Sequence, residues 1–425
     1  MKAYTYILSL VFLMVFIPFQ KVNAQDNLLS LETAKTMALT NNKKIKKAIQ
    51  TIEAAKSAKA SVYASDKPFV DASIMGLNVG DPFNTLLPEF SANASLGITQ
   101  VLYAGGKINS AKKITSKAVD LYTSQKTLTN SEVLLDVETT YWQLVNVKGK
   151  VTLATKYKAL LTELLKDLTN LYEAGIIYKN DMLQVQVKLN EAELNLTKAT
   201  DGLSLLKLKL AQLTGMPDAN FIIEDTITND IVLINETSKA VAIENRPEIQ
   251  MLRNAVEIEE LQAKILNGDR KPTIALNVSG IYANGKNINF TDASNEITSY
   301  YGLISVNIPV FDWGGRRHKV KEQEFKIAAQ KLELEDTEEL LSLQIQKTYL
   351  ELQQAIKRVE ITKKSLSQAE ENLRLNEDRF EAGTVIGKDV LEAQVLWQQA
   401  YAELIDAKAM CKINEATYKK AIAEY

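Results

Sequence analysis

The stretch "RFEAGTVIGKDVLEAQ" at residues 379–394 repeats, in outline, the stretch "LYEAGIIYKNDMLQVQ" at residues 171–186, which lies 208 positions earlier. Each copy has Glu-Ala-Gly at the end of a long helix-forming run, and an acidic residue near the start of the next run. A glycine that follows a helical pattern signals the end of a helix, because glycine accepts the left-handed conformation of a C-terminal cap. The repeated stretch therefore predicts two helical hairpins in a duplicated chain.

Each of these turns closes a run that predicts an unusually long helix. Residues 316–380 contain neither glycine nor proline, and residues 107–172 contain one glycine, Gly149, and no proline. At 1.5 Å per residue, a helix of about 65 residues spans roughly 100 Å. Apolar residues recur in both runs at spacings of three, four and seven, which predicts a face buried against other helices. Shorter helices are expected at residues 181–212 and 389–421.

Two pairs of β-like runs precede the long helices, at residues 69–103 and 273–311. A Lys-Pro dipeptide, beginning at Lys67 and at Lys271, ends the helix before each pair, because proline disfavours helix in the residue before it. In the second pair apolar residues alternate with small or polar ones, Ile274, Leu276, Val278 and Tyr282 against Thr273, Ala275, Asn277 and Ser279. This alternation suits a transmembrane β-barrel with lipid outside and water inside. The alternative is a small soluble sheet between coiled-coil arms.

Four such strands are too few to close a barrel around a channel, so several copies of the chain would have to contribute. A homo-oligomer is the natural way to supply them.

The chain of 425 residues carries a formal net charge of −2. Residues 1–24 predict a secretory signal, with Lys2, the apolar run "YILSLVFLMVFIPF" and small residues before Gln25. That run is shorter than the roughly 20 residues that span a bilayer, which disfavours the alternative of a membrane anchor. Its removal takes away Lys2 and Lys21 and no acid, which makes the mature chain more acidic. Such a charge excludes a basic nucleic-acid binder.

Residues that carry common catalytic chemistry are scarce. The chain has one cysteine, Cys411, and one histidine, His318, which exclude an internal disulfide, a His-rich metal site and a catalytic triad. No nucleotide-binding, metalloprotease or nucleophile motif occurs. The basic run "GGRRHK" at residues 314–319 lacks the spacing of a phosphate-binding loop, and a helix start near lipid headgroups explains it better. We therefore expect no enzyme and no cofactor.

The predicted organisation is a signal followed by two copies of one unit and a connector. The predicted parts are a signal peptide (1–24), a first repeat (25–212), a connector (213–238) and a second repeat (239–425). Each repeat is expected to contain a helix, a strand pair, a long helix and a shorter helix. The fold class is therefore mainly α with a small β part.

This order, written twice, resembles the TolC family of outer-membrane efflux and secretion channels. The resemblance covers residues 31–425 and includes "NRPEI" at residues 245–249, a Gly-Gly-basic start of each long helix, and residues 379–394. It implies a homotrimer in the cell outer membrane, with four strands per chain in a twelve-stranded transmembrane β-barrel that contacts outer-membrane lipid. The long helices would form a hollow α-barrel, a tunnel in the periplasm, with the connector in a belt around it.

The resemblance also places the two Gly turns at the periplasmic tip of the tunnel, where similar channels meet a periplasmic membrane-fusion adaptor protein. By position, the predicted docking residues are Ala174, Gly175, Ile176, Ala382, Gly383 and Thr384. The alternative is a plain hairpin turn without a partner, since a glycine C-cap needs no partner to explain it.

Acidic residues follow each turn. Asp389 and Glu392 are three positions apart and so share one helix face, and the first-copy positions are Asp181 and Gln184. Similar channels carry acidic rings at this constriction, which implies a pore gate made by Asp389, Glu392 and Asp181. Such a ring would favour cations and could bind divalent ions. Alternatively, Asp181 and Asp389 cap their helices, and both roles can hold together.

The predicted function is a passive trimeric outer-membrane channel for efflux of small molecules such as drugs and toxic compounds. It would be the outer component of a tripartite pump, with the adaptor as direct partner and an inner-membrane pump or ABC exporter as indirect partner. No nucleic acid is expected to bind. The alternatives are the outer-membrane component of type I protein secretion, and a non-conducting secreted coiled-coil scaffold.

Overall fold

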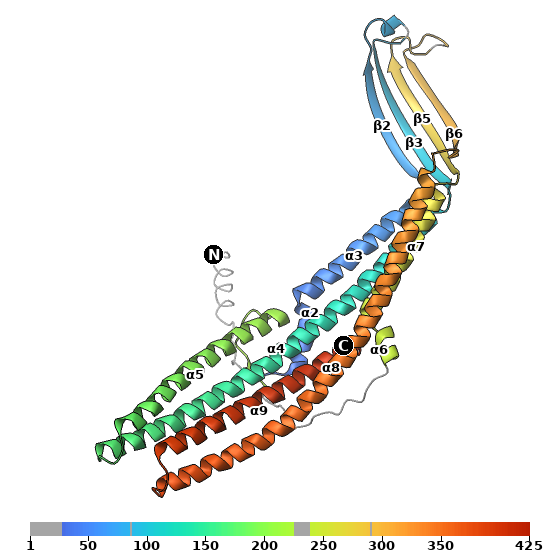
Figure 1. Ribbon diagram of the computed structural model, residues 1–425. Helices are drawn as coiled ribbons and strands as arrows, with labels where there is room; N and C mark the ends of the chain where they lie inside the picture. Colours follow the sequence, from blue (N-terminus) through green and yellow to red (C-terminus); the bar gives the residue numbers. More distant parts are fainter. Residues whose placement is uncertain (1–27, 86, 225–238, 290) are drawn as a thin grey trace, which may run out of the picture.

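The protein is an elongated molecule with a four-stranded sheet at one end and two helical hairpins at the other (Figure 1). The computed structural model describes residues 28–85, 87–224, 239–289 and 291–425. The predicted signal peptide, residues 1–24, and the larger part of the predicted connector, residues 225–238, lie outside the described residues.

Each repeat contains the same series of elements. The first has α2 (Leu31–Asn41), α3 (Lys43–Ala64), β2 (Phe69–Asn78), β3 (Phe90–Ala104), α4 (Lys107–Glu173) and α5 (Lys179–Thr214). The second has α6 (Lys239–Glu244), α7 (Pro247–Gly268), β5 (Thr273–Gly285), β6 (Glu296–Asn307), α8 (Gly315–Glu381) and α9 (Gly387–Ala421). The small elements are β1 (Leu28–Leu29), β4 (Ile222–Ile223) and the 3-10 turn η1 (Phe83–Thr85). Both long helices have 67 residues, and α3 and α7 both have 22. The predicted fold class, mainly helical with a small β part, is confirmed.

Several predicted boundaries differ from the observed ones by a few residues. Helices α5 and α9 begin two residues before the predicted starts at 181 and 389, because the backbone N–H of Asp181 and of Asp389 already closes a first turn. The second strand pair was predicted to reach residue 311, but β6 ends at Asn307. Pro309 explains the early end, because proline has no N–H to donate to a strand neighbour.

The sheet has the order β2-β3-β5-β6, with all neighbours antiparallel, so the β3–β5 pair joins the two repeats. Ile274 pairs with Val306 and Leu276 with Ile304, and these residues form what we call the apolar face. The opposite, polar face carries cross-strand hydrogen bonds from the Thr99 hydroxyl to Asn277 (2.9 Å) and between the Ser73 and Ser95 hydroxyls (2.8 Å). The register separates the residues of β5 as the sequence alternation predicted, and the polar face also carries Phe69, the partner of Thr99, and Leu303, the partner of Asn277.

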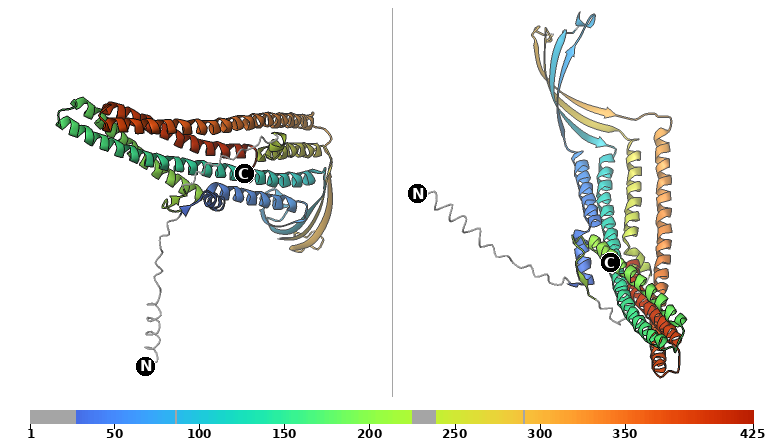
Figure 2. Two further views of the ribbon diagram at one scale, coloured as in Figure 1. Left: turned by 90° about the horizontal axis from the view of Figure 1, so that it is seen from below. Right: turned by 90° about the vertical axis from the view of Figure 1, so that its left-hand side faces the viewer.

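The helices form a single-layered, curved wall in which α4 and α8 run the full length (Figures 1 and 2). In the half next to the sheet the packing order is α3-α4-α7-α8, and in the half next to the hairpins it is α5-α4-α9-α8. Helices α3, α5 and α8 therefore lie at the edges of the wall, and α4 lies inside it. Among the described helices, none is both long and apolar enough to cross a bilayer.

Glycines in the left-handed conformation start both long helices. The φ angles are +87° at Gly106 and +84° at Gly314, and each residue is the N-cap of its helix. The position before Gly106 is Gly105 at φ +66°, and the position before Gly314 is Trp313 at φ +56°. The two Gly-Gly pairs were therefore wrongly predicted to be equivalent. Gly106 corresponds to Gly314, and Gly105 corresponds to Trp313.

The "NRPEI" segment ties the second repeat together. Arg246 is buried, and its guanidinium donates to the backbone carbonyls of Lys420 (2.9 Å) and Ala421 (3.1 Å) at the end of α9. The same group pairs with the Glu248 carboxylate at 2.6 Å. A cation at the carboxyl end of a helix satisfies carbonyls that have no partner within the helix.

Candidate functional site

The first candidate tip lies between α4 and α5 and closes with a Schellman motif. Gly175 has φ +75°, and its N–H donates to the carbonyl of Tyr172 at 2.9 Å. The N–H of Ile176 donates to the carbonyl of Leu171, also at 2.9 Å. These are the two bonds that define the motif, and they require a residue in the left-handed region at the glycine position.

The second candidate tip, between α8 and α9, repeats this geometry. Gly383 has φ +70°, its N–H donates to Phe380 at 2.9 Å, and the N–H of Thr384 donates to Arg379 at 2.9 Å. The Thr384 hydroxyl adds a third bond to the Arg379 carbonyl at 3.0 Å. All six predicted docking residues are exposed, and the turns that carry them form the far ends of the two hairpins (Figure 1).

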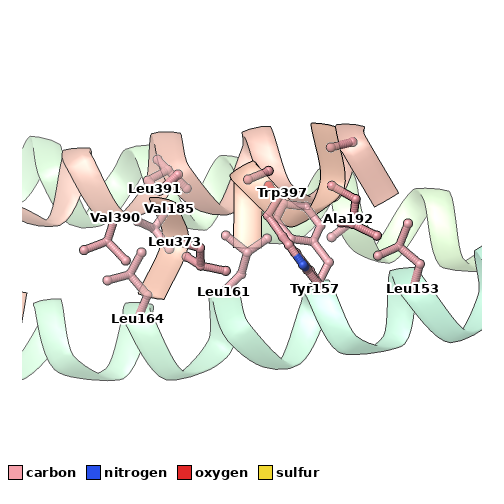
Figure 3. Close-up of a cluster of buried hydrophobic side chains, with 14 of the residues drawn as sticks. Leu153, Tyr157, Leu161, Leu164, Val185, Ala192, Leu373, Val390, Leu391 and Trp397 are labelled. Atoms are coloured by element: carbon pink, nitrogen blue, oxygen red, sulfur yellow. The ribbon is translucent and has the colours of Figure 1, made fainter. Parts of the chain in front are cut away.

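A shared apolar cluster holds the two hairpins side by side. Residues of α4, α5, α8 and α9 all point into it, as Figure 3 shows. Its members nearest the tips are Leu161, Leu164, Leu168, Val185, Leu373, Val390 and Leu391. Burial of an aliphatic side chain of this size contributes about 1.5–3 kcal/mol, so the cluster fixes the position of the exposed turns.

Gly387, at the start of α9, is a site residue that the sequence analysis missed. It is buried, and a Cβ atom there would lie 2.5 Å from Cδ2 of Leu168 on α4. The glycine therefore permits the close approach of α9 to the first hairpin. The corresponding residue of the first copy is the exposed Lys179, and this difference between the two copies was the available signal.

Asp389 caps the start of α9. Its Oδ2 atom accepts the backbone N–H of Ile386 at 3.2 Å, while its own N–H donates to the Ile386 carbonyl at 3.0 Å. Asp181 occupies the same third position of α5, but its side chain has no hydrogen bond or ion pair within the described residues. The capping role therefore holds for Asp389 and not for Asp181.

Glu392 is exposed one turn further along α9, with Lys388 Nζ at 3.6 Å from its carboxylate. Neither Asp389 nor Glu392 contacts Asp181 through a hydrogen bond or ion pair within the described part of the chain. In those same residues, no three His, Cys, Asp or Glu side chains are grouped so as to hold a metal ion. Within one chain, the Asp389 and Glu392 carboxylates are therefore linked neither to Asp181 nor to each other through a metal-binding group.

Further acidic residues lie close to the second tip. Burial raises the pKa of the Glu377 carboxyl above its usual range, and the nearby carboxylates of Glu163, Asp378 and Glu381 raise it further. This group is not evident in the sequence, because Glu163 lies on α4, more than 200 residues before the other three on α8. Carboxylates of α8 therefore lie near Glu163 of α4, in addition to the two predicted gate residues of α9.

Comparison with known proteins places this arrangement in a family. A family model described as "Outer membrane efflux protein" matches residues 36–216 and 240–424, which correspond to the two structural repeats. Outer membrane protein TolC of Escherichia coli (strain K12) is 22% identical over 344 residues, covering 78% of this chain and 69% of the relative.

Solved structures agree with this assignment at the level of the fold. A membrane protein from Pseudomonas aeruginosa matches with a TM-score of 0.82 and 17% identity, over 92% of this chain and 93% of that chain. The CmeC outer membrane channel of Campylobacter jejuni matches with a TM-score of 0.80 and 16% identity, over 92% and 85% of the two chains. The resemblance to TolC-like channels is confirmed: the chain belongs to the outer membrane efflux protein family.

Proposed function

We propose that this chain forms a homotrimeric, passive outer-membrane channel that serves as the outer component of a tripartite efflux pump for small molecules. The observation that carries the proposal is an unclosed wall. Both the sheet and the helical layer end in free edges, at β2 and β6 in the sheet and at the outer helices of the wall. A sheet edge presents unpaired N–H and C=O groups, which are expected to find a partner strand.

The edge helices support the same conclusion, because they expose large apolar side chains along their length. The exposed set includes Leu183, Val187, Leu194, Leu205 and Leu208 on α5, and Phe325, Leu332, Leu340, Leu343 and Leu350 on α8. An apolar stripe of this kind favours association with another helix. Three copies of the chain would cover these stripes and would combine their strands into one closed barrel of twelve.

The two sheet faces suit a barrel wall. The apolar face exposes Ile74 (86%), Ile304 (64%) and Val306 (55%), whereas the polar face carries the serine, threonine and asparagine pairs described above. In a closed barrel the first face would meet lipid and the second would line a water-filled passage. The tunnel formed by the helices would then extend into the periplasm.

For the tips we propose docking of a periplasmic membrane-fusion adaptor at Ala174, Gly175, Ile176, Ala382, Gly383 and Thr384. Ile176 is 69% exposed at the end of its hairpin, where a single chain offers it no cover. The apolar side chain would give the adaptor a surface to pack against, and the glycine, which has no side chain, would let the adaptor's backbone come close. An inner-membrane pump or ABC exporter would supply the energy through the adaptor.

For the gate we propose that Asp389 and Glu392 of three chains form a ring of carboxylates, with Asp181 nearby in the constriction. A conservative variant separates this role from capping. Asp389→Asn keeps an oxygen that can accept the Ile386 N–H but removes the charge, whereas Asp389→Ala removes both. If the ring acts on ions, Asp389→Asn combined with Glu392→Gln weakens divalent-cation block in planar bilayers while α9 stays capped. Unchanged block would show that Asp389 only caps the helix.

Membrane fractionation tests the function as a whole. The proposed channel should fractionate with outer membranes, require detergent for extraction, run as a trimer and conduct ions in planar bilayers. Release by osmotic shock without detergent would instead establish the secreted scaffold. Genes encoding an adaptor and a proton-driven pump beside this one would favour efflux over type I protein secretion, for which an ABC exporter is expected.

A further inference from the structure

A basic cavity lies where the strands meet the helices, at the opposite end of the wall from the tips. Its volume is about 280 Å³, and it is formed by the first turns of α4 and α8, the end of α7, the start of β5 and the residues that follow β6. The charged residues that line it are Lys107, Asp269, Lys271, Arg316 and Lys319. The cavity therefore has four cationic side chains and one carboxylate.

The carboxylates near the cavity leave two of its lysines unpaired. Asp269 pairs with Lys107 at 2.9 Å, and Asp312, just outside the lining, pairs with Arg316 at 3.5 Å. Lys271 and Lys319 are exposed and form no ion pair with any described residue. Glu322, one turn further along α8, attracts Lys319, but its carboxylate is paired with Lys326 at 2.7 Å. Two lysines without an ion-pair partner among the described residues thus line one small cavity.

Asp312 is held by the start of α8 and cannot turn toward these lysines. Its carboxylate accepts the N–H of Arg316 at 2.7 Å and that of Gly314 at 3.2 Å. The first of these bonds is the main reason why the pKa of Asp312 lies below its usual range. The acid therefore stays charged and committed to the helix start.

Close backbone packing fixes the other side of the cavity. A Cβ atom on Gly268 would lie 2.6 Å from Cγ of Lys107, and one on Gly105 would lie 2.5 Å from the Gly268 carbonyl oxygen. The end of α7 therefore presses against the stem of Lys107 and holds its amine beside Asp269. The cavity is thus formed by the ends of helices and strands and by the short segments between them, which contain Lys271 and Pro309.

The strand residues that line the cavity show that it lies on the polar face of the sheet. Thr273 and Asn307 both line it, and they are direct cross-strand partners. They belong to the polar face, since Ile274 and Val306, the adjacent pair, lie on the apolar face. In a barrel whose apolar face meets lipid, the polar face meets water. A ligand of this cavity therefore arrives from solution.

We propose that this cavity binds a small soluble oxyanion of the phosphate class. Lys271 and Lys319 would supply the charge, and the Thr273 hydroxyl and Asn307 amide would donate hydrogen bonds. The volume lies just below the range of about 300–1,000 Å³ typical of small-molecule pockets, which favours an ion with its water over a drug-sized compound. The choice of a soluble ligand rests on the proposed barrel, but anion binding can be measured whether or not the chain conducts.

Chemical footprinting on the unmodified full-length chain provides the direct test. The protein in detergent micelles, at low ionic strength, is titrated with inorganic phosphate and treated with an amine-acetylating reagent, and each lysine is read by mass spectrometry. We expect saturable protection of Lys271 and Lys319. Lys363 is the matched control, because it is exposed on the same helix α8, has no ion pair among the described residues, and lies about 66 Å from Lys319 along the helix.

Calorimetric titration of variants supplies a second readout. Lys271→Gln and Lys319→Gln should each weaken phosphate binding at least fivefold, Lys319→Arg should retain it, and Lys363→Gln should leave it unchanged. Absence of saturable protection, or equal weakening by Lys363→Gln, would overturn the proposal. A third arm replaces phosphate with phosphatidylglycerol in the micelles. Protection by this lipid alone would place the ligand in the membrane and would refute a soluble anion.

Discussion

Replacing Gly383 with alanine tests whether the repeated turn depends on backbone conformation rather than on packing. Gly383 has φ +70°, and a Cβ atom there would meet nothing within 4 Å. The cost of the change is therefore the left-handed penalty alone, about 1–2 kcal/mol. This cost falls on the bonds from the N–H groups of Gly383 and Thr384. If this cost lowers the free energy of local opening of the turn, amide hydrogen exchange there should become about 5- to 30-fold faster.

The same substitution at Gly202 is a matched control with the opposite sign. Gly202 lies inside α5, and a Cβ atom there would lie 3.9 Å from Cγ1 of Val147, an ordinary contact. Alanine in a helix interior is more stable than glycine by about 0.5–1 kcal/mol, so exchange around Gly202 should slow. Mass spectrometry of peptides spanning each position measures both effects in one experiment. Wild-type exchange in Gly383→Ala, with slowed exchange in Gly202→Ala, would refute the conformational argument.

Three other changes test the surroundings of the tips and the long helices. Gly387→Leu should cost about 1–3 kcal/mol through overpacking against Leu168 and speed exchange in the first turn of α9, whereas Lys179→Leu at the equivalent exposed position should not. Arg246→Met removes the donor to the Ala421 carbonyl and leaves the Glu248 carboxylate without its partner, so it should cost about 3 kcal/mol and expose the end of α9 to limited proteolysis. Burial, and then Glu191, raises the pKa of Tyr157 to about 12, above the value near 10 in the unfolded chain. The contribution of Tyr157 to the free energy of unfolding is therefore full below pH 10 and falls by about 2 kcal/mol as pH rises to 12. In thermal melts, Tyr157→Phe should lose correspondingly less stability over this pH range.

Much of the fold could be predicted from the sequence because glycine and proline mark the ends of its elements. The stop at Lys67 and Lys271 and the turns at Gly175 and Gly383 depend on local backbone preferences, which a single sequence reveals. The order of helices in the wall could not be predicted. A stripe of apolar residues shows that a helix buries one face, but it does not identify the helix that covers that face.

In the candidate site, too, local features could be predicted from the sequence, and contacts between distant residues could not. The positive φ at the turn glycines follows from local geometry, and both turns appear where the repeated stretch predicted them. The requirement for Gly387 comes from Leu168, which is more than 200 residues away in the sequence. The left-handed conformation of Trp313 was equally hidden, because an aromatic residue gives no local sign of a positive φ. Contacts between repeats, unlike turns within them, leave little trace in one sequence.

The contacts between the hairpins also constrain how the tip of the proposed trimer could widen. Helices α4 and α9 lie next to each other and share the buried cluster, and Gly387 brings them into close contact. Separating them would expose several aliphatic side chains, each worth about 1.5–3 kcal/mol. Helices α5 and α8 lie at the edges of the wall formed by the described helices, where a neighbouring chain of the proposed trimer would cover them. A widening that preserves the cluster must therefore take place between chains. Asp389 and Glu392 belong to α9, inside the wall, so in such a motion they would move as one body with α4.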